Sequence, residues 1–534
     1  MDFRRLFGQC WTVKNNTYAE TCSGDQSWGI VYGYVSKVTV QDLVKDIAPP
    51  PAFAGGVVVI NQSQPTVEID ATLSPYRIIT ASDDQPGIYA QGIYNVKINS
   101  VGDIATSGAR SEAIGGRGIL GRTDIDSQGN LSTTGDNAYG ILAYGYAAGV
   151  SVVSHGNIST AGDGSHAIYA FNQRQAIAIS IDSTGDLTTT GYASSGVRVN
   201  SAGSADVKSR GSITTTGTGS YGMRIDAASG TAVAYGKGDI TTHGDSAPSI
   251  VVHAAQDATV TIIGNIVTGG TNSHGVVARS YNADVSITSS GNIETHGSSA
   301  HGIDATADLG AVSIVNGAGI QTSGAGAVGI AANAATSANA TNTGDITTSG
   351  DRGRAISVTG GSRATVENHG KLFTDGVYAD GIYAASSAGS VSVYSSSDIA
   401  TGGDFAHGID AQSSGGGVEV TNTGPITTNG SGADAILALS WSTNGAVQIG
   451  NSAALLKTTG DRANAINASA NGDITITSSG DIATSGINSR GITARSEHGA
   501  RDPPERQQHR DGRRLWWLWH PRLWPAGCLG HEHR

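Results

Sequence analysis

The sequence predicts an all-β fold, a parallel β-solenoid of about 16 coils with about 27 residues and three short strands in each coil. Three observations predict it: a seven-residue phrase that recurs at a nearly constant interval, two further apolar phrases at fixed distances from it, and a composition of small residues. Gly contributes 76 of 534 residues, whereas Pro contributes 12 and Met 2. This composition favours short strands separated by turns over a helical bundle.

The recurring phrase sets the period. GDIATSG at 102–108 returns in fourteen later copies, the last being GDIATSG at 480–486, so fourteen steps span 378 residues and the mean period is 27. Each copy has Ile or Leu at its third position, Thr at its fifth and Gly at its seventh. A less regular copy precedes them, with Ile78 and Thr80 at the matching positions. Stacked coils can bury these positions together, although no single coil can form a core.

Two more apolar phrases complete each coil. One lies ten residues after the first Ile or Leu, as in Gly140-Ile141 and Gly302-Ile303, and always has Gly, Ala or Ser before the apolar residue. The other alternates apolar and polar residues, as in Val285-Ser286-Ile287, which is the pattern of a half-buried strand. Each coil is therefore expected to contain three strands.

The residue types at each position predict which side chains point inward. The fourth position of the phrase holds residues as different as Glu294, Phe373 and Lys457, so we expect it to face solvent and the third and fifth positions to share the inner face. We expect each inward Thr hydroxyl to bond to a neighbour or to the backbone, because an unpaired buried hydroxyl costs roughly 1–3 kcal/mol. The Gly at the seventh position is expected to supply a turn conformation closed to other residues.

Repeats such as GDITTSGDRGRAISV at 344–358, with an alternating third strand, resemble the passenger regions of bacterial autotransporters, the type V secretion family. The resemblance covers residues 57–495 and implies a right-handed parallel β-helix of the pertactin type. Members of that family are exported by a C-terminal outer-membrane β-barrel and commonly act as adhesins, which implies a location at the cell surface, in the outer membrane or outside the cell. No signal peptide is visible and no barrel strands follow residue 495, so the chain is expected to be a passenger truncated before its barrel.

The segments that flank the repeats have separate interpretations. Residues 1–56 form an N-terminal segment that could cap the first coil, and Cys10 could pair with Cys22 in it. Residues 496–534 form a basic, Trp-rich tail. Shifting the reading frame by one base converts four of its residues to Gly and can restore a coil, so the tail is expected to be out of frame and disordered; these residues are Trp516, Trp517, Trp519 and Trp524. The alternative is a genuine cationic segment for a membrane or nucleic acid.

Charge and hydropathy argue against nucleic acid as the main partner and against a transmembrane segment. The formal net charge of −12 argues against nucleic acid as the main partner. No uninterrupted apolar run approaches the roughly 18 residues of a membrane-spanning helix, so no transmembrane segment is expected in this chain.

Recurrent acidic residues invite a metal interpretation. Asp or Asn occupies the second position of the phrase in many copies, as at Asp103, and Asp often follows its last Gly, as at Asp136. Stacked carboxylates of this kind could hold Ca²⁺, but turns formed by Asp and Asn are the favoured interpretation. No metal-binding residue is therefore assigned, and no cofactor is expected.

The HGID phrases at 301–304 and 407–410 are the strongest candidates for catalysis. They supply His301, Asp304, His407 and Asp410. Four coils separate the two pairs, so they are not expected to form one site. Thr arrays could suggest ice binding, but the only constant Thr is expected to face inward. No catalytic residue is therefore assigned.

The expected function is a non-enzymatic, surface-displayed or secreted, adhesin-like passenger whose partners are ligands on host or matrix surfaces or other cells. One alternative is a carbohydrate-active β-helix enzyme, a lyase or hydrolase. Such an enzyme needs outward carboxylates or basic residues grouped on adjacent coils and long loops that enclose a cleft, for which spacings of 26 to 30 residues leave little room. Another alternative is a nonfunctional frameshifted fragment.

Overall fold

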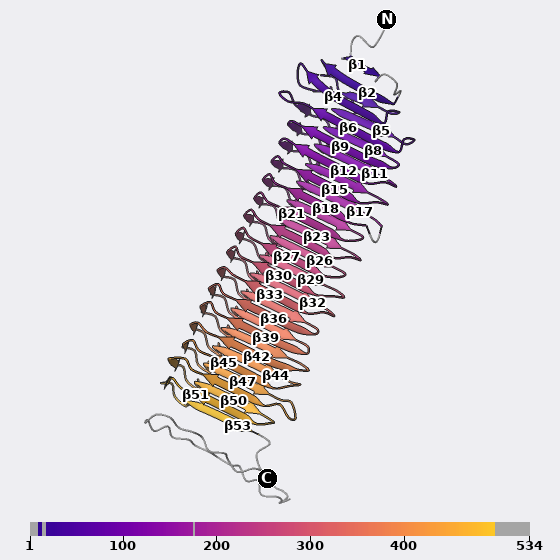
Figure 1. Ribbon diagram of the computed structural model, residues 1–534. Coiled ribbons are helices and arrows are strands. Elements are labelled where there is room, and N and C mark those ends of the chain that lie inside the picture. Colours follow the sequence, from indigo (N-terminus) through magenta and orange to yellow (C-terminus); the bar gives the residue numbers. More distant parts are fainter. Residues whose placement is uncertain (1–8, 13–17, 175–176, 497–534) are drawn as a thin grey trace, which may run out of the picture. The chain divides into compact units, whose positions relative to one another are not determined.

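The computed structural model describes residues 9–12, 18–174 and 177–496, which form a parallel β-solenoid of about 17 turns (Figure 1). The predicted period and the three strands per coil are confirmed. The described residues contain no helix, and so none that is long and apolar enough to span a bilayer. Ser496, the first residue of the predicted Trp-rich tail, ends a strand of the solenoid, and the rest of that tail, residues 497–534, lies outside the described part of the chain.

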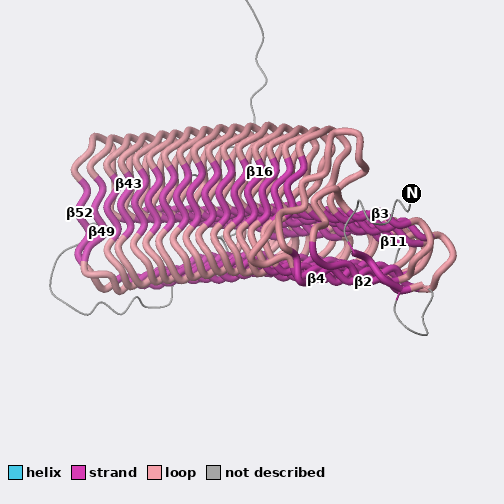
Figure 2. Tube along the Cα trace, turned by 90° about the horizontal axis from the view of Figure 1, so that it is seen from above, coloured by secondary structure: helices cyan, strands magenta, loops and turns pink. Residues whose placement is uncertain are grey.

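From β7 to β51, each coil contributes one strand to each of three sheets, which we call sheets I, II and III. The chain passes from sheet I to sheet II to sheet III and then enters sheet I of the next coil. Figure 2 shows the strands of sheet I from β16 to β52 stacked in sequence order. Strands that are neighbours in space therefore come from successive coils.

Sheet I is built from the recurring phrase, and 16 strands belong to it. They are β7 (Ile78–Thr80), β10 (Ile104–Thr106), β13 (Leu131–Thr133), β16 (Ile158–Thr160), β19 (Leu187–Thr189), β22 (Ile213–Thr215), β25 (Ile240–Thr242), β28 (Ile266–Thr268), β31 (Ile293–Thr295), β34 (Ile320–Thr322), β37 (Ile346–Thr348), β40 (Leu372–Thr374), β43 (Ile399–Thr401), β46 (Ile426–Thr428), β49 (Leu455–Thr458) and β52 (Asp481–Thr484).

Sheet II begins at the second apolar phrase of each coil. Its strands are β3 (Ile30–Tyr32), β5 (Val57–Asn61), β8 (Ile88–Gly92), β11 (Ile114–Gly118), β14 (Ile141–Gly145), β17 (Ile168–Asn172), β20 (Val197–Ser201), β23 (Met223–Ala227), β26 (Ile250–Ala254), β29 (Val276–Ser280), β32 (Ile303–Ala307), β35 (Ile330–Ala334), β38 (Ile356–Gly360), β41 (Ile382–Ser386), β44 (Ile409–Ser413), β47 (Ile436–Ser440), β50 (Ile466–Ala470) and β53 (Ile492–Ser496).

Sheet III holds the alternating phrase and 19 strands. They are β1 (Gln9–Thr12), β2 (Ala19–Gly24), β4 (Lys37–Leu43), β6 (Thr66–Thr72), β9 (Asn95–Val101), β12 (Thr123–Gln128), β15 (Val150–Ser154), β18 (Ile179–Ser183), β21 (Ala205–Ser209), β24 (Ala232–Gly236), β27 (Ala258–Ile262), β30 (Val285–Ser289), β33 (Val312–Asn316), β36 (Ser337–Asn342), β39 (Arg363–Asn368), β42 (Ser390–Ser395), β45 (Val418–Asn422), β48 (Val447–Asn451) and β51 (Ile474–Ser478).

The strand register aligns equivalent positions of the repeat. In sheet I, Ile104 pairs with Leu131 and Thr106 with Thr133, and all four side chains are buried. The residue between them is partly or largely exposed in these strands. The inward assignment of the third and fifth positions is therefore confirmed. Buried Ile, Leu, Val and Ala from all three sheets form one continuous core along the solenoid.

Close packing between coils explains the Gly at the seventh position of the phrase. A Cβ atom added at Gly135 would overlap the main-chain carbonyl oxygen of Gly108 in the preceding coil, and one added at Gly162 would overlap that of Gly135. The left-handed backbone conformation occurs instead two residues after this Gly, as at Arg110 and Asn137. The expectation that this Gly supplies a special turn conformation is therefore wrong. Gly is required because the main chains of adjacent coils approach too closely to leave room for a side chain.

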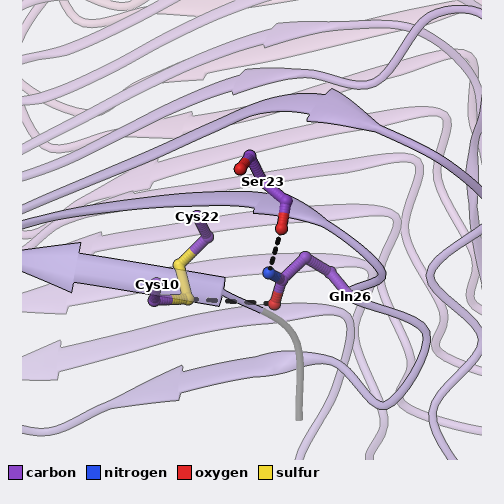
Figure 3. The surroundings of a disulfide bond; sticks show 4 residues. All are labelled: Cys10, Cys22, Ser23 and Gln26. Carbon is purple, nitrogen blue, oxygen red and sulfur yellow. Dashed lines mark hydrogen bonds between the residues drawn. A yellow bond between two sulfur atoms is a disulfide. The ribbon is translucent and has the colours of Figure 1, made fainter. Parts of the chain in front are cut away.

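The sheets extend to the N-terminal side of residue 57. β2 and β4 pair in parallel with each other and β4 with β6, while β3 joins β5 in sheet II. β1 pairs with β2 in the antiparallel direction, and a disulfide between Cys10 and Cys22 joins these two strands (Figure 3), as the sequence allowed. Beside it, buried Gln26 donates a 2.8 Å hydrogen bond from Nε2 to the carbonyl oxygen of Ser23.

Candidate functional site

A row of polar side chains precedes sheet II, two positions before the first residue of many of its strands; we call it the acceptor row. The side chain of one coil accepts a hydrogen bond from the main-chain N–H of the row in the next coil. These bonds are His166 Nδ1 with Ser195 N (2.9 Å), His274 Nδ1 with His301 N (3.1 Å), His301 Nδ1 with Val328 N (2.9 Å), Asp380 Oδ1 with His407 N (2.9 Å), His407 Nδ1 with Asp434 N (3.0 Å), Asp434 Oδ1 with Asn464 N (2.6 Å) and Asn464 Oδ1 with Arg490 N (3.1 Å). The row therefore ties successive coils together.

The row requires neutral histidines. An imidazole nitrogen accepts a hydrogen bond only when it carries no proton, so each of these rings holds its proton on Nε2. Burial lowers the pKa of His166 to about 4, with a further contribution from the charge of Arg198, and burial lowers the pKa of His274 to about 4 as well. Both rings are therefore neutral at pH 7.

His274, His301 and Asp304 form a cluster in which one ligand atom of each residue lies within 4.8 Å of the others. The centroids of the two imidazole rings are 4.9 Å apart. Because both Nδ1 atoms accept main-chain N–H groups, only the protonated Nε2 atoms remain for a metal ion. Coordination would require deprotonating these rings fully or breaking the bonds between coils. The donor chemistry fits the acceptor row better than a metal centre.

The two HGID phrases lie apart, as their spacing predicts. His301 and Asp304 belong to the coil of β32, and His407 and Asp410 belong to the coil of β44. The strands β35, β38 and β41 lie between them in sheet II.

Asp380, His407 and Asp410 gather on two adjacent coils. Asp380 is 2% exposed and its Oδ2 lies 2.8 Å from Nε of Arg354. Asp410 is 5% exposed and both its oxygens lie 2.9 Å from Nε2 of Gln412. Burial, with the nearby charge of Asp380, raises the pKa of Asp410 to about 6, and burial also raises the pKa of Asp380.

An open hollow of about 390 Å³ lies beside this cluster, lined by Arg352, Arg354 and Tyr378. Cζ of Arg354 lies 3.9 Å from the centroid of the Tyr383 ring, so Tyr383 and Asp380 together hold the guanidinium in place.

Tyr378 stacks against Phe405 of the next coil. Their ring centroids are 5.1 Å apart with an angle of 11° between the planes, and their exposed fractions are 50% and 47%. Both residues have the left-handed backbone conformation, with φ of 58° and 55°, and Arg352 has φ of 58° at the equivalent position of the preceding coil. We call this position the left-handed corner. In most other coils it holds Gly, Asn, Asp, Ser or Ala, as at Asp84, Asn137, Gly164, Ala193, Gly219, Ser246, Asn272, Ser299, Gly326, Gly432 and Asn488.

The acidic residues singled out from the repeat also bond between coils. Asp103 Oδ1 accepts a 2.8 Å hydrogen bond from Asn130 N, and Asp136 Oδ1 accepts a 2.9 Å bond from Asp163 N. The same bond is made by Asp186, Asp239, Asp245, Asp345, Asp351, Asp404 and Asp461. These oxygens bond to the next coil and not within their own turn, which corrects the expectation of Asp and Asn turns.

No family model, curated protein or solved structure matches the chain. The solenoid fold is consistent with a pertactin-like β-helix, and this similarity rests on the fold alone.

Sequence reasoning missed the hollow and the acceptor row. The row could have been found by aligning the residue before each Gly-Ile, Ala-Ile or Gly-Val pair, because His, Asp and Asn recur there. The hollow forms because Arg352 and Arg354 of one coil lie beside Tyr378 of the next, which can be known only from the register of the coils.

Proposed function

We propose that the chain is a non-enzymatic, adhesin-like passenger, displayed at the cell surface or secreted, whose partners are ligands on host or matrix surfaces or on other cells. The observation that carries this proposal is the placement of bulky exposed side chains on a solenoid whose inward positions are nearly uniform. The exposed aromatic residues in the strands and corners include Tyr94, Tyr146, Tyr192, Tyr281, Phe373, Tyr378, Phe405 and Trp441.

A repeat scaffold suits such a role. The core depends on the inward Ile, Val, Ala and Thr of every coil, so outward residues can vary without loss of stacking. Exposed aromatic side chains supply large contact area with few rotatable bonds, and they are enriched where proteins bind partners. The variable outward positions are therefore the binding surface in this proposal.

A second candidate, a carbohydrate-active β-helix enzyme, is favoured by one observation. Asp380 and Asp410 lie on adjacent coils with raised pKa values, as a general acid requires. The non-enzymatic proposal ranks first because both carboxylates are almost fully buried and both oxygens of each are engaged, Asp380 by His407 N and Arg354 and Asp410 by Gln412.

One experiment compares the two candidates. The full chain is immobilised on beads, and binding to epithelial cells and to wells coated with matrix proteins or polysaccharides is measured against beads coated with albumin. In parallel, the same polysaccharides are incubated with the soluble chain, and released reducing ends and unsaturated products are measured. Saturable binding without cleavage supports the adhesin-like role. Cleavage that Asp410→Asn abolishes establishes the enzyme, and absence of binding to every surface overturns the proposal.

A further inference from the structure

The hollow beside β38 has features of a ligand site that the solenoid itself does not need. Its volume of about 390 Å³ falls within the roughly 300–1,000 Å³ of small-molecule pockets. It combines cationic groups with a flat aromatic surface, whereas the whole chain has a formal net charge of −12. An anionic ligand with a ring can contact both kinds of group in this hollow.

Bulky residues occupy the left-handed corner in three successive coils at the hollow. Arg352, Tyr378 and Phe405 occupy the left-handed corner in three successive coils, a conformation unfavourable for bulky residues. Arg110, at the same corner, is accounted for by its ion pair with Asp84 of the preceding coil. Arg462 also has this conformation, without an ion pair among the described residues, so the feature that distinguishes the hollow is the succession of three bulky residues at the corner.

We propose that this hollow binds a sugar ring that bears a carboxylate, such as a uronic acid unit of an acidic polysaccharide. The inference rests on the proposed function, because it names the ligand class of one part of that binding surface. Arg352 and Arg354 recognise the carboxylate, and Tyr378, supported by Phe405, receives the apolar face of the ring.

The two arginines suit a carboxylate. Arg354 is fixed by Asp380 through Nε and by the Tyr383 ring, and its terminal Nη groups make no hydrogen bond to the described residues. Arg352 forms no ion pair within the described part of the chain and lies on the same hollow. A guanidinium held in one orientation can donate two parallel hydrogen bonds to a carboxylate with little loss of entropy.

The aromatic pair suits a sugar ring. Tyr378 lines the hollow and is half exposed, and the parallel ring of Phe405 on the next coil holds the Tyr378 ring in place. The C–H groups on one face of a pyranose ring pack well on such a surface.

The test uses the full chain and a trimer of galacturonic acid, with its neutral methyl ester as the matched ligand, in isothermal titration calorimetry. Tyr378→Asn removes one aromatic face and places at the corner a residue type that other coils tolerate there. Arg352→Gln removes one cation. The control is Arg462→Gln, at the same corner of another coil but without stacked aromatic neighbours. Circular dichroism melting verifies that the variants fold.

The acidic trimer is expected to bind, the ester to bind at least about tenfold more weakly, and Arg352→Gln and Tyr378→Asn each to weaken binding at least about tenfold. Arg462→Gln is expected to bind like the parent. Equal binding of trimer and ester, no binding of the trimer, or an equal loss in Arg462→Gln overturns the inference. Binding of adenosine monophosphate as tight as that of the trimer also overturns it, since the site then selects an anion with any ring.

The two proposals fail separately. If the chain adheres to cells or coated wells but does not bind the trimer, the inference about the hollow is wrong and the adhesin-like function stands. If the trimer binds but the chain adheres to none of the surfaces, the hollow is a sugar site in a protein with another role.

Discussion

Thr215 donates a 2.7 Å hydrogen bond from its hydroxyl to the carbonyl oxygen of Ser220, and both residues are fully buried. The equivalent bond, from the inward Thr of sheet I to the carbonyl five residues later, is made in every coil from Thr80 to Thr458 except at Thr242. Thr242 is equally buried, but its hydroxyl has no partner among the described residues. Adjacent coils thus provide a matched pair of sites.

Thr215→Val is expected to destabilise the coil of β22 by about 1–3 kcal/mol, because it leaves the buried carbonyl of Ser220 without that donor. Thr242→Val removes a hydroxyl that makes no bond, so it is expected to be neutral or to stabilise its coil. The measurement is hydrogen exchange by mass spectrometry of peptides from each coil, since a long solenoid need not unfold in one step. Equal losses in the two variants would contradict the assignment of the bond as the stabilising feature.

Gly350→Ala is expected to destabilise strongly, by several kcal/mol, because its Cβ would overlap the main-chain carbonyl oxygen of Gly324 in the preceding coil. Gly219→Asn is the control. Gly219 has φ of 68° with no atom within 4 Å of an added Cβ, and Asn tolerates that conformation. We expect its urea midpoint to stay close to that of the parent chain. A loss of stability as large as that of Gly350→Ala would show that the backbone conformation at the left-handed corner limits stability more than the close approach of adjacent coils does.

The fold could be predicted because the constraint repeats. An inward position must hold a residue that suits the interior in every coil, so the recurrence of Ile346 and Thr348 in the repeat indicates the inner face. The recurrence of Gly at the seventh position was also evident from the sequence, but the physical reason for this Gly was not. A sequence shows that Cβ is excluded and does not show whether a dihedral angle or a neighbouring carbonyl excludes it.

The candidate site could be predicted only in part, since it depends on positions where the repeat varies. His301 and Asp304 were identified from their phrase, whereas the acceptor role of Nδ1 depends on the main-chain N–H of the next coil. Tyr378 and Phe405 are 27 residues apart in sequence and become neighbours only through the register of successive coils.

Glu112→Gln is expected to raise stability at pH 8 by roughly 1–3 kcal/mol and to leave it unchanged at pH 4. Burial raises the pKa of Glu112 to about 7, well above its ordinary value of 4.5. Between these values the unfolded chain has lost the proton that the folded chain retains, so the contribution of Glu112 to stability falls as pH rises and is lost above about pH 7. Gln is neutral at every pH. Urea unfolding at the two pH values tests this, and the same gain at pH 4 would refute the electrostatic explanation.

His274→Asn is expected to remove part of the acid sensitivity of the solenoid. The pKa of His274 is about 4 in the folded chain against an ordinary value of 6.5, so between these values the unfolded chain binds more protons and stability rises with pH. Acidification from pH 7 to pH 4 should therefore cost on the order of 3 kcal/mol at this residue, as the protonated ring can no longer accept the N–H of His301.

Asn is the suitable replacement, because Asn464 already fills the acceptor row with Oδ1 and does not titrate. We expect His274→Asn to match the parent near pH 7 and to exceed its stability at pH 4.5, in urea unfolding combined with hydrogen exchange of the β28 and β29 peptides. His243→Asn, at an exposed position outside the row, serves as the control. Its stability should depend on pH as that of the parent does. An unchanged pH dependence in His274→Asn would mean that its imidazole is not the titrating group that links these coils.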